Sequence, residues 1–119
     1  MSQRAPGSQP ASRPTRRYPR YPLDARIVAS VFRAGTHTSL WGRSCELGED
    51  GIGGTLSGDL EVGEVVAMEF SVPGGAHSLK IRAAVRYRDG FRCGFEFLAM
   101  SEEQREMIRQ ACALLAQLQ

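Results

Sequence analysis

The sequence predicts a mainly β protein: a small antiparallel β-barrel of six to seven strands with one C-terminal α-helix. Short runs rich in β-branched and aromatic residues follow one another between residues 26 and 97, several with apolar residues at every second position. Turn signals rich in glycine separate these runs. Near the C-terminus the apolar residues change once to helical spacing. Many short strands at close spacing are typical of small barrels, and the single helix is expected to lie across one end.

The expected strands follow in order along the chain. Residues 26–33 and 37–47 flank a turn at Ala34-Gly35-Thr36, and an acidic turn ends the second strand. The third run, 52–56, contains two glycines, which inside a strand indicate a bulge or the close approach of a backbone or ligand. Three further runs are expected at 64–72, 78–88 and 91–97.

Three details of this barrel are expected from local sequence patterns. Asp89-Gly90 is a strong signal for a two-residue hairpin turn. Trp41 is expected to fill the core, because a lone tryptophan in a small barrel usually does so. Alternation within residues 78–88 predicts one apolar face made of Leu79, Ile81, Ala83, Val85 and Tyr87.

The helix is expected over residues 102–118. Ser101 and Gln104 have the spacing of a capping box, and Glu102 and Glu103 suit the positive end of the helix dipole. The apolar stripe consists of Met107, Ile108, Ala111, Leu114, Leu115 and Leu118.

With 119 residues the chain is expected to form one domain. Residues 1–15 form a basic leader that is too polar to fold alone, and residues 16–119 form the barrel domain. Residues 1–20 carry five arginines and no acid, a charge of +5; because the total is +2, residues 21–119 sum to −3. A basic arm on an acidic body indicates an anionic ligand for the arm and argues against a nucleic-acid-binding domain.

Three cysteines without a C-x-x-C motif argue against a disulfide framework or a metal site, and indicate reduced thiols in the cytoplasm. No apolar run is long enough to span a membrane, and no membrane partner is expected. Recognisable catalytic motifs are absent, so an enzyme is not expected, and neither is a cofactor.

The candidate ligand-binding residues lie in two short segments. The first, Arg16-Arg17-Tyr18-Pro19-Arg20, has an Arg-x-x-x-Arg spacing in an extended, proline-broken arm. The second, Glu46-Leu47-Gly48-Glu49-Asp50-Gly51, is a tight acidic turn between two expected strands. Arginines hold phosphates and stack on purine faces, whereas a carboxylate accepts hydrogen bonds from the N–H edge of guanine. The two segments therefore predict a clamp for a guanine nucleotide, half mobile and half fixed.

In order and spacing these segments resemble the PilZ domain, the bacterial receptor module for cyclic di-GMP, over about residues 14–118. The strand C-G-F-E-F-L and the capped helix that follows it strengthen the resemblance. The family motifs are R-x-x-x-R and [DN]-x-S-x-x-G. The resemblance implies a cyclic di-GMP receptor that reorders its arginine arm on binding and relays the signal to a protein partner. It assigns the ligand to Arg16, Arg17, Arg20, Glu46, Gly48 and Gly51.

Several alternatives stay open. Arg13 to Arg17 has the same spacing as Arg16 to Arg20, although the latter fits the distance to the first strand better. In the second motif Glu46 replaces Asp or Asn, Gly48 replaces serine, and Asp50 adds a negative charge. These departures weaken nucleotide binding, so the alternative is an adaptor that binds protein partners without nucleotide. A basic-armed nucleic-acid binder is a weaker third interpretation, because no strand face gathers basic and aromatic residues.

Overall fold

The computed structural model describes residues 17–119; residues 1–16, which hold the expected leader and Arg16, lie outside the described residues. Seven strands precede one helix. The strands within residues 17–119 are β1 (Tyr21–Pro22), β2 (Arg26–Arg33), β3 (Thr36–Leu47), β4 (Gly51–Leu56), β5 (Val65–Phe70), β6 (Leu79–Asp89) and β7 (Arg92–Ala99). The helix is α1 (Glu102–Ala116).

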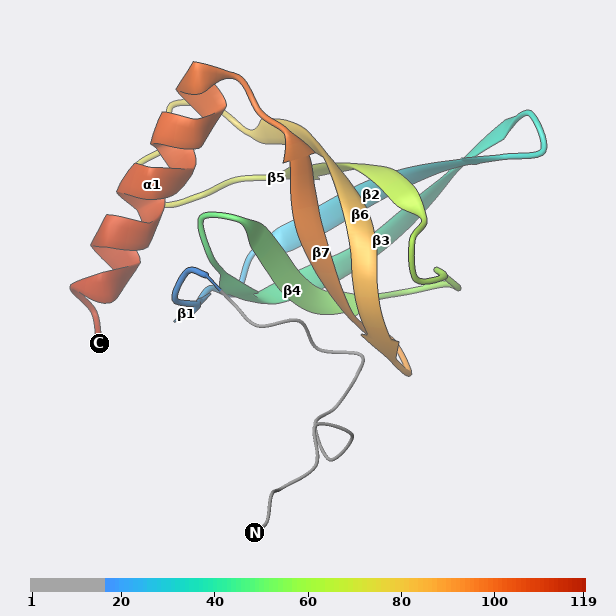
Figure 1. The fold of residues 1–119 in the computed structure, drawn as a ribbon, viewed down its shortest axis with the longest axis horizontal. Helices are drawn as coiled ribbons and strands as arrows, with labels where there is room; N and C mark the ends of the chain where they lie inside the picture. Colours follow the sequence, from blue (N-terminus) through green and yellow to red (C-terminus); the bar gives the residue numbers. More distant parts are fainter. Residues whose placement is uncertain (1–16) are drawn as a thin grey trace, which may run out of the picture.

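Six of these strands close a barrel. The order is β3-β2-β5-β6-β7-β4, every neighbouring pair is antiparallel, and pairing of β4 with β3 completes the circle. Strand β1 adds to β3, with Tyr21 opposite Leu47 and Pro22 opposite Glu46. In Figure 1 the β2–β3 hairpin extends from one side of the barrel, whereas β1 and α1 lie at the other. The predicted fold class, a barrel of six to seven strands with a C-terminal helix, is confirmed.

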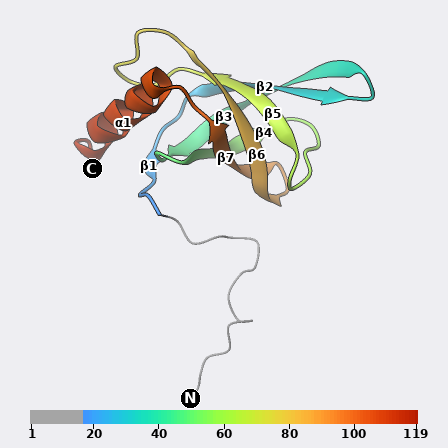
Figure 2. The ribbon, with the colours of Figure 1, turned by 45° about the horizontal axis from the view of Figure 1, so that its top comes forward.

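The core fills the barrel from its inward-facing strand positions, and α1 closes one end (Figure 2). Ile108, Ala111, Cys112 and Leu115 form the buried stripe of the helix. The predicted capping box is present, with Ser101 and Gln104 each accepting a hydrogen bond from the other's backbone N–H. The helix ends at Ala116, before the expected end at Leu118, which is exposed. No helix within residues 17–119 is long and apolar enough to cross a membrane.

Three local expectations were wrong, each because of strand register. A β-bulge between Val85 and Tyr87 shifts the alternation of β6, so Tyr87 leaves the apolar face that its neighbours in sequence share. Asp89 pairs with Arg92, which moves the hairpin turn to residues 90–91. Trp41 lies next to the buried Leu40 on β3 and therefore points outward, with 52% of its surface exposed.

Candidate functional site

The acidic turn between β3 and β4 is held by backbone contacts. The N–H of Gly48 donates to the carbonyl of Gly51 at 2.9 Å, and the carbonyl of Asp50 accepts from the N–H of Phe97 at 2.9 Å. A Cβ at Gly51 would lie 2.1 Å from the carbonyl oxygen of Phe95. Only glycine lets β4 approach β7 this closely, so the family's closing glycine has a clear steric reason here.

Arg20 lies on this turn. Strand β1 pairs Tyr21 with Leu47, and this pairing brings the preceding arginine over the turn. The Arg20 guanidinium is 3.5 Å from a Glu46 carboxylate oxygen through Nη1 and 3.4 Å from Asp50 Oδ1 through Nη2. Its side chain is only 15% exposed. The structure thus brings the second arginine of the first motif into contact with two residues of the second motif.

Gly48 provides the surface on which Arg20 rests. A Cβ at this position would lie 2.7 Å from Arg20 Cδ, 2.8 Å from Arg20 Nε and 2.9 Å from the carbonyl oxygen of Pro19. Real Cβ atoms do not approach other heavy atoms this closely. Arg20 Nε is buried there and, within the described part of the chain, has no hydrogen-bond partner. The arginine therefore lies flat against a position where the family pattern has serine.

A row of paired residues continues the site across the barrel wall. Glu46 pairs with Gly53, Gly53 with Gly94, and Gly94 with Tyr87, on strands β3, β4, β7 and β6. A Cβ at Gly94 would lie 2.1 Å from the Tyr87 ring, and one at Gly53 would lie 3.2 Å from the Glu46 carboxylate. Two glycines thus form a flat strip of backbone with a carboxylate at one end and an aromatic ring at the other. The Tyr87 ring lies against Gly94 and the Glu46 side chain against Gly53, because neither glycine has a side chain that would keep them away from the sheet.

Charges around the row are mixed. The side chain of Arg92 hydrogen bonds with Tyr87, which raises the pKa of Arg92, and the Glu46 carboxylate adds to this rise. On the helix side, burial raises the pKa of the Cys112 thiol to about 11, and the carboxylates of Glu49 and Asp50 act in the same direction. Cys112 is therefore a neutral thiol packed beneath the turn, and the polar chemistry of the site rests with its arginines and carboxylates.

Of the six predicted site residues, the structure brings four together: Arg20, Glu46, Gly48 and Gly51. Arg16 lies outside the described residues. Arg17 is exposed and lies over the ring of Tyr18, with its Cζ 5.8 Å from the ring centroid.

Sequence reasoning missed three neighbours of the site: Tyr87, Gly94 and Arg92. The bulge in β6 hid the position of Tyr87, because strict alternation placed it in the core. A glycine within an otherwise apolar strand was the one available signal for Gly94.

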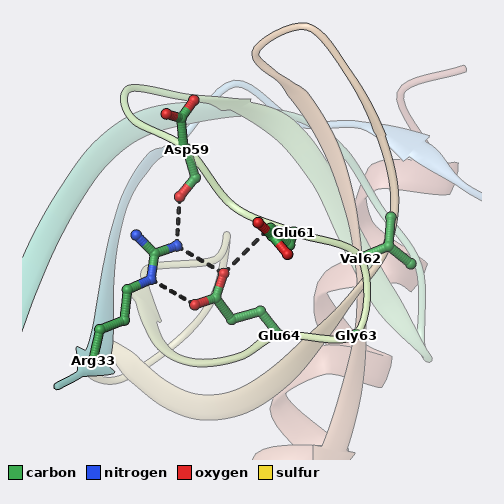
Figure 3. Close-up of a pocket in the computed structure, with 6 residues that line it drawn as sticks. All are labelled: Arg33, Asp59, Glu61, Val62, Gly63 and Glu64. Carbon is green, nitrogen blue, oxygen red and sulfur yellow. Dashed lines mark hydrogen bonds and ion pairs between the residues drawn. The ribbon is translucent and has the colours of Figure 1, made fainter.

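A pocket lies beside the loop between β4 and β5 (Figure 3), and Figure 1 shows this loop at the side of the barrel away from α1. Its centre is Arg33, which donates to the two carboxylate oxygens of Glu64 at 2.6 and 2.7 Å and to the Asp59 carbonyl at 2.6 Å. The hydrogen bond from Arg33 lowers the pKa of Glu64 and raises that of Arg33. Arg33 Nε and Nη2 thus tie the end of β2 to the loop between β4 and β5, and this cluster stabilises the loop.

The comparisons with known proteins agree with this geometry. The family model of the PilZ domain matches residues 14–114. The chain therefore belongs to the PilZ domain family. No match to a curated protein was found.

Solved structures share the fold. The PilZ domain of YcgR from Escherichia coli, determined with c-di-GMP, superposes with a TM-score of 0.59 at 22% identity, covering 87% of this chain and 90% of that one. The PilZ domain of CeSA from a cellulose-synthesizing bacterium gives a TM-score of 0.60 at 16% identity, covering 80% and 96%. The Bacillus subtilis inhibitor of motility, MotI/DgrA, gives 0.63 at 16% identity, covering 88% of this chain and 52% of that protein.

Within residues 17–119 no group of three or more His, Cys, Asp or Glu side chains is arranged to hold a metal ion. The described site instead offers guanidinium donors, carboxylate acceptors and an aromatic ring. These groups are suited to an anionic, planar, hydrogen-bonding ligand.

Proposed function

We propose that this protein is a cyclic di-GMP receptor of the PilZ type. The observation that carries the proposal is the position of Arg20 on the turn of Glu46, Gly48 and Gly51, about 26 residues further along the chain. The guanidinium is suited to a ligand phosphate, and the Glu46 carboxylate to the N–H edge of a guanine. The row of paired residues from Glu46 through Gly53 and Gly94 to Tyr87 supports the proposal, because it places a carboxylate acceptor and an aromatic ring on the same face of the sheet.

The proposed response uses the segment before β1. Arg16 and Arg17 close over the bound nucleotide, and the covered ligand presents a composite surface to a protein partner in the cytoplasm. Tyr21 and Pro22 already pair with β3, so we place the rearrangement in the Arg20 side chain and in the residues that precede it. Ordering such a segment on binding uses part of the interaction energy and provides the switch.

The second candidate is a PilZ adaptor that binds a protein partner without nucleotide. Gly48 favours the adaptor, because it lacks the hydroxyl of the serine that the family motif has at this position. Asp50 favours it as well, because it places an additional carboxylate 3.4 Å from Arg20. Loss of one hydrogen bond costs about 0.5–1.5 kcal/mol, or up to about tenfold in affinity. A loss of this size weakens a binding site without abolishing it, and for this reason we favour the receptor.

Calorimetric titration with cyclic di-GMP separates the two candidates. The wild type is expected to bind, and Arg20→Ala to lose on the order of 2 kcal/mol, or about 30-fold in affinity. Arg20→Lys should recover only part of the loss, because an ammonium group lacks the planar fork. Arg33→Ala is the matched control, since Arg33 also forms an ion pair but does so at the end of β2, beside the loop between β4 and β5 (Figure 3). Absence of binding by a folded wild type at high ligand concentration would favour the adaptor.

A further inference from the structure

The contacts of Arg20 have a consequence for ligand affinity, and the inference below rests on the proposed function. The guanidinium holds Glu46 and Asp50 on its two terminal nitrogens, 3.5 and 3.4 Å away. These nitrogens are the donors that a ligand phosphate needs. The Glu46 carboxylate is also the acceptor proposed for guanine. One arginine therefore occupies both halves of the clamp when no ligand is present.

We propose that Asp50 and Gly48 make this arginine an internal competitor of the ligand: Asp50 holds Arg20 in the turn, and the missing side chain at Gly48 gives it the space. Nucleotide binding then requires Arg20 to leave its own carboxylates. These two departures from the family motif, Gly48 and Asp50, act together to lower the affinity for the nucleotide. We call the four residues involved, Arg20, Glu46, Gly48 and Asp50, the Arg20 latch.

The steric evidence for the latch is specific to Gly48. Any Cβ there would overlap the Arg20 stem and Nε at 2.7 and 2.8 Å. A serine at this position, as in the family motif, is therefore incompatible with the observed Arg20 conformation. Burial strengthens the ion pair between Arg20 and Asp50. The Arg20 side chain is 15% exposed and that of Asp50 is 31% exposed, so both charges are partly shielded from solvent.

The electrostatic part is tested with Asp50→Asn, which keeps the shape and removes the charge. The turn itself should survive, because Asp50 supports the fold through its backbone carbonyl, which accepts from the Phe97 N–H. Asp59→Asn is the matched control: Asp59 also forms an ion pair with an arginine, at 3.2 Å, in the loop on the far side of the barrel. Both variants change the net charge equally.

Two readouts are needed. The first is titration with cyclic di-GMP. Asp50→Asn should tighten binding about two- to fivefold, the range expected when one partly shielded ion pair no longer has to be broken. Asp59→Asn should stay within about twofold of the wild type. The second readout needs no nucleotide. Phenylglyoxal modifies accessible guanidinium groups, so the rate of Arg20 modification, followed by peptide mass spectrometry relative to the exposed Arg105, should rise in Asp50→Asn.

Simple charge repulsion between Asp50 and the phosphates is the competing explanation. Repulsion predicts that Asp50→Asn tightens binding equally in an Arg20→Ala background. The latch predicts that the gain disappears in the Arg20→Ala/Asp50→Asn double variant, because no arginine remains to be released.

The outcomes distinguish the two proposals. An unchanged Arg20 modification rate in Asp50→Asn, or an equal gain in the Arg20→Ala background, overturns the latch while leaving the receptor function intact. If Asp50→Asn raises Arg20 reactivity but neither it nor the wild type binds cyclic di-GMP, the latch stands as a contact and the proposed ligand is wrong.

Discussion

Substitution of Gly48 tests the site most directly, because the structure gives a definite geometry for the new side chain. Gly48 is not among the described glycines with positive φ, which are Gly35, Gly58, Gly63, Gly74 and Gly90. The backbone can therefore accept alanine or serine without torsional strain. The new Cβ would nevertheless lie within 3 Å of Arg20 and of the Pro19 carbonyl oxygen. Because a side chain moves more easily than a paired backbone, we expect Arg20 to be displaced.

The magnitudes follow from the contacts that are lost and gained. Displacing Arg20 breaks two partly shielded ion pairs, worth about 0.2–1 kcal/mol each, so both variants should lose about 0.5–2 kcal/mol in free energy of unfolding. For the ligand the same displacement is favourable. Gly48→Ala should bind cyclic di-GMP several-fold more tightly than the wild type. Gly48→Ser should gain a further 0.5–1.5 kcal/mol or so, up to about tenfold, from a new hydrogen bond.

The assay combines urea unfolding with calorimetric titration of the wild type, Gly48→Ala and Gly48→Ser. Alanine is the matched control for serine, because it adds the Cβ without the hydroxyl. Equal affinities of the two variants would exclude a role for the hydroxyl. Weaker binding by both variants, with the fold intact, would refute the reasoning, since it would show that Gly48 holds Arg20 in the conformation that binds the ligand.

Three further predictions concern the arm, the aromatic end of the site and the distant ion pair. Hydrogen exchange should show residues 17–19 protected only with cyclic di-GMP; equal protection in both states would contradict a responsive arm. Tyr87→Ala should weaken binding by about 1–3 kcal/mol and Tyr87→Phe by much less; equal losses would argue against base stacking. The hydrogen bond from Arg33 lowers the pKa of Glu64, so the folded state stabilises the Glu64 carboxylate. This stabilisation of the fold is fully present above the ordinary pKa of 4.5 and is lost as the pH falls through the lowered pKa of the folded state. Urea unfolding should therefore show a smaller acid-induced loss for Glu64→Gln than for the wild type; identical losses would exclude this ion pair as the cause.

The sequence by itself was sufficient for the architecture. Alternating apolar residues, turn glycines and the Ser101–Gln104 capping box are local patterns, and local patterns determine which segments become strands and where a helix begins. The order and spacing of the two motifs, through the resemblance to the family, predicted one site made of Arg20 and the turn of Glu46, Gly48 and Gly51, and the structure brings these residues together. The steric need for glycine next to β7 gives a physical reason for Gly51.

Only the tertiary structure decided which groups meet across strands. A single bulge in β6 moved Tyr87 from the expected core face onto Gly94, and ordinary alternation on β3 turned Trp41 outward. The sequence showed Asp50 as an added charge near the expected ligand site. Its ion pair with Arg20, however, depends on the pairing of β1 with β3, which no local sequence pattern predicted. Register and bulges arise from packing between segments distant in sequence, and one residue of shift reverses the face of every side chain that follows. For this reason the sequence was enough to predict the fold and the motifs, whereas the contacts of Arg20 with Glu46 and Asp50 could be found only in the tertiary structure.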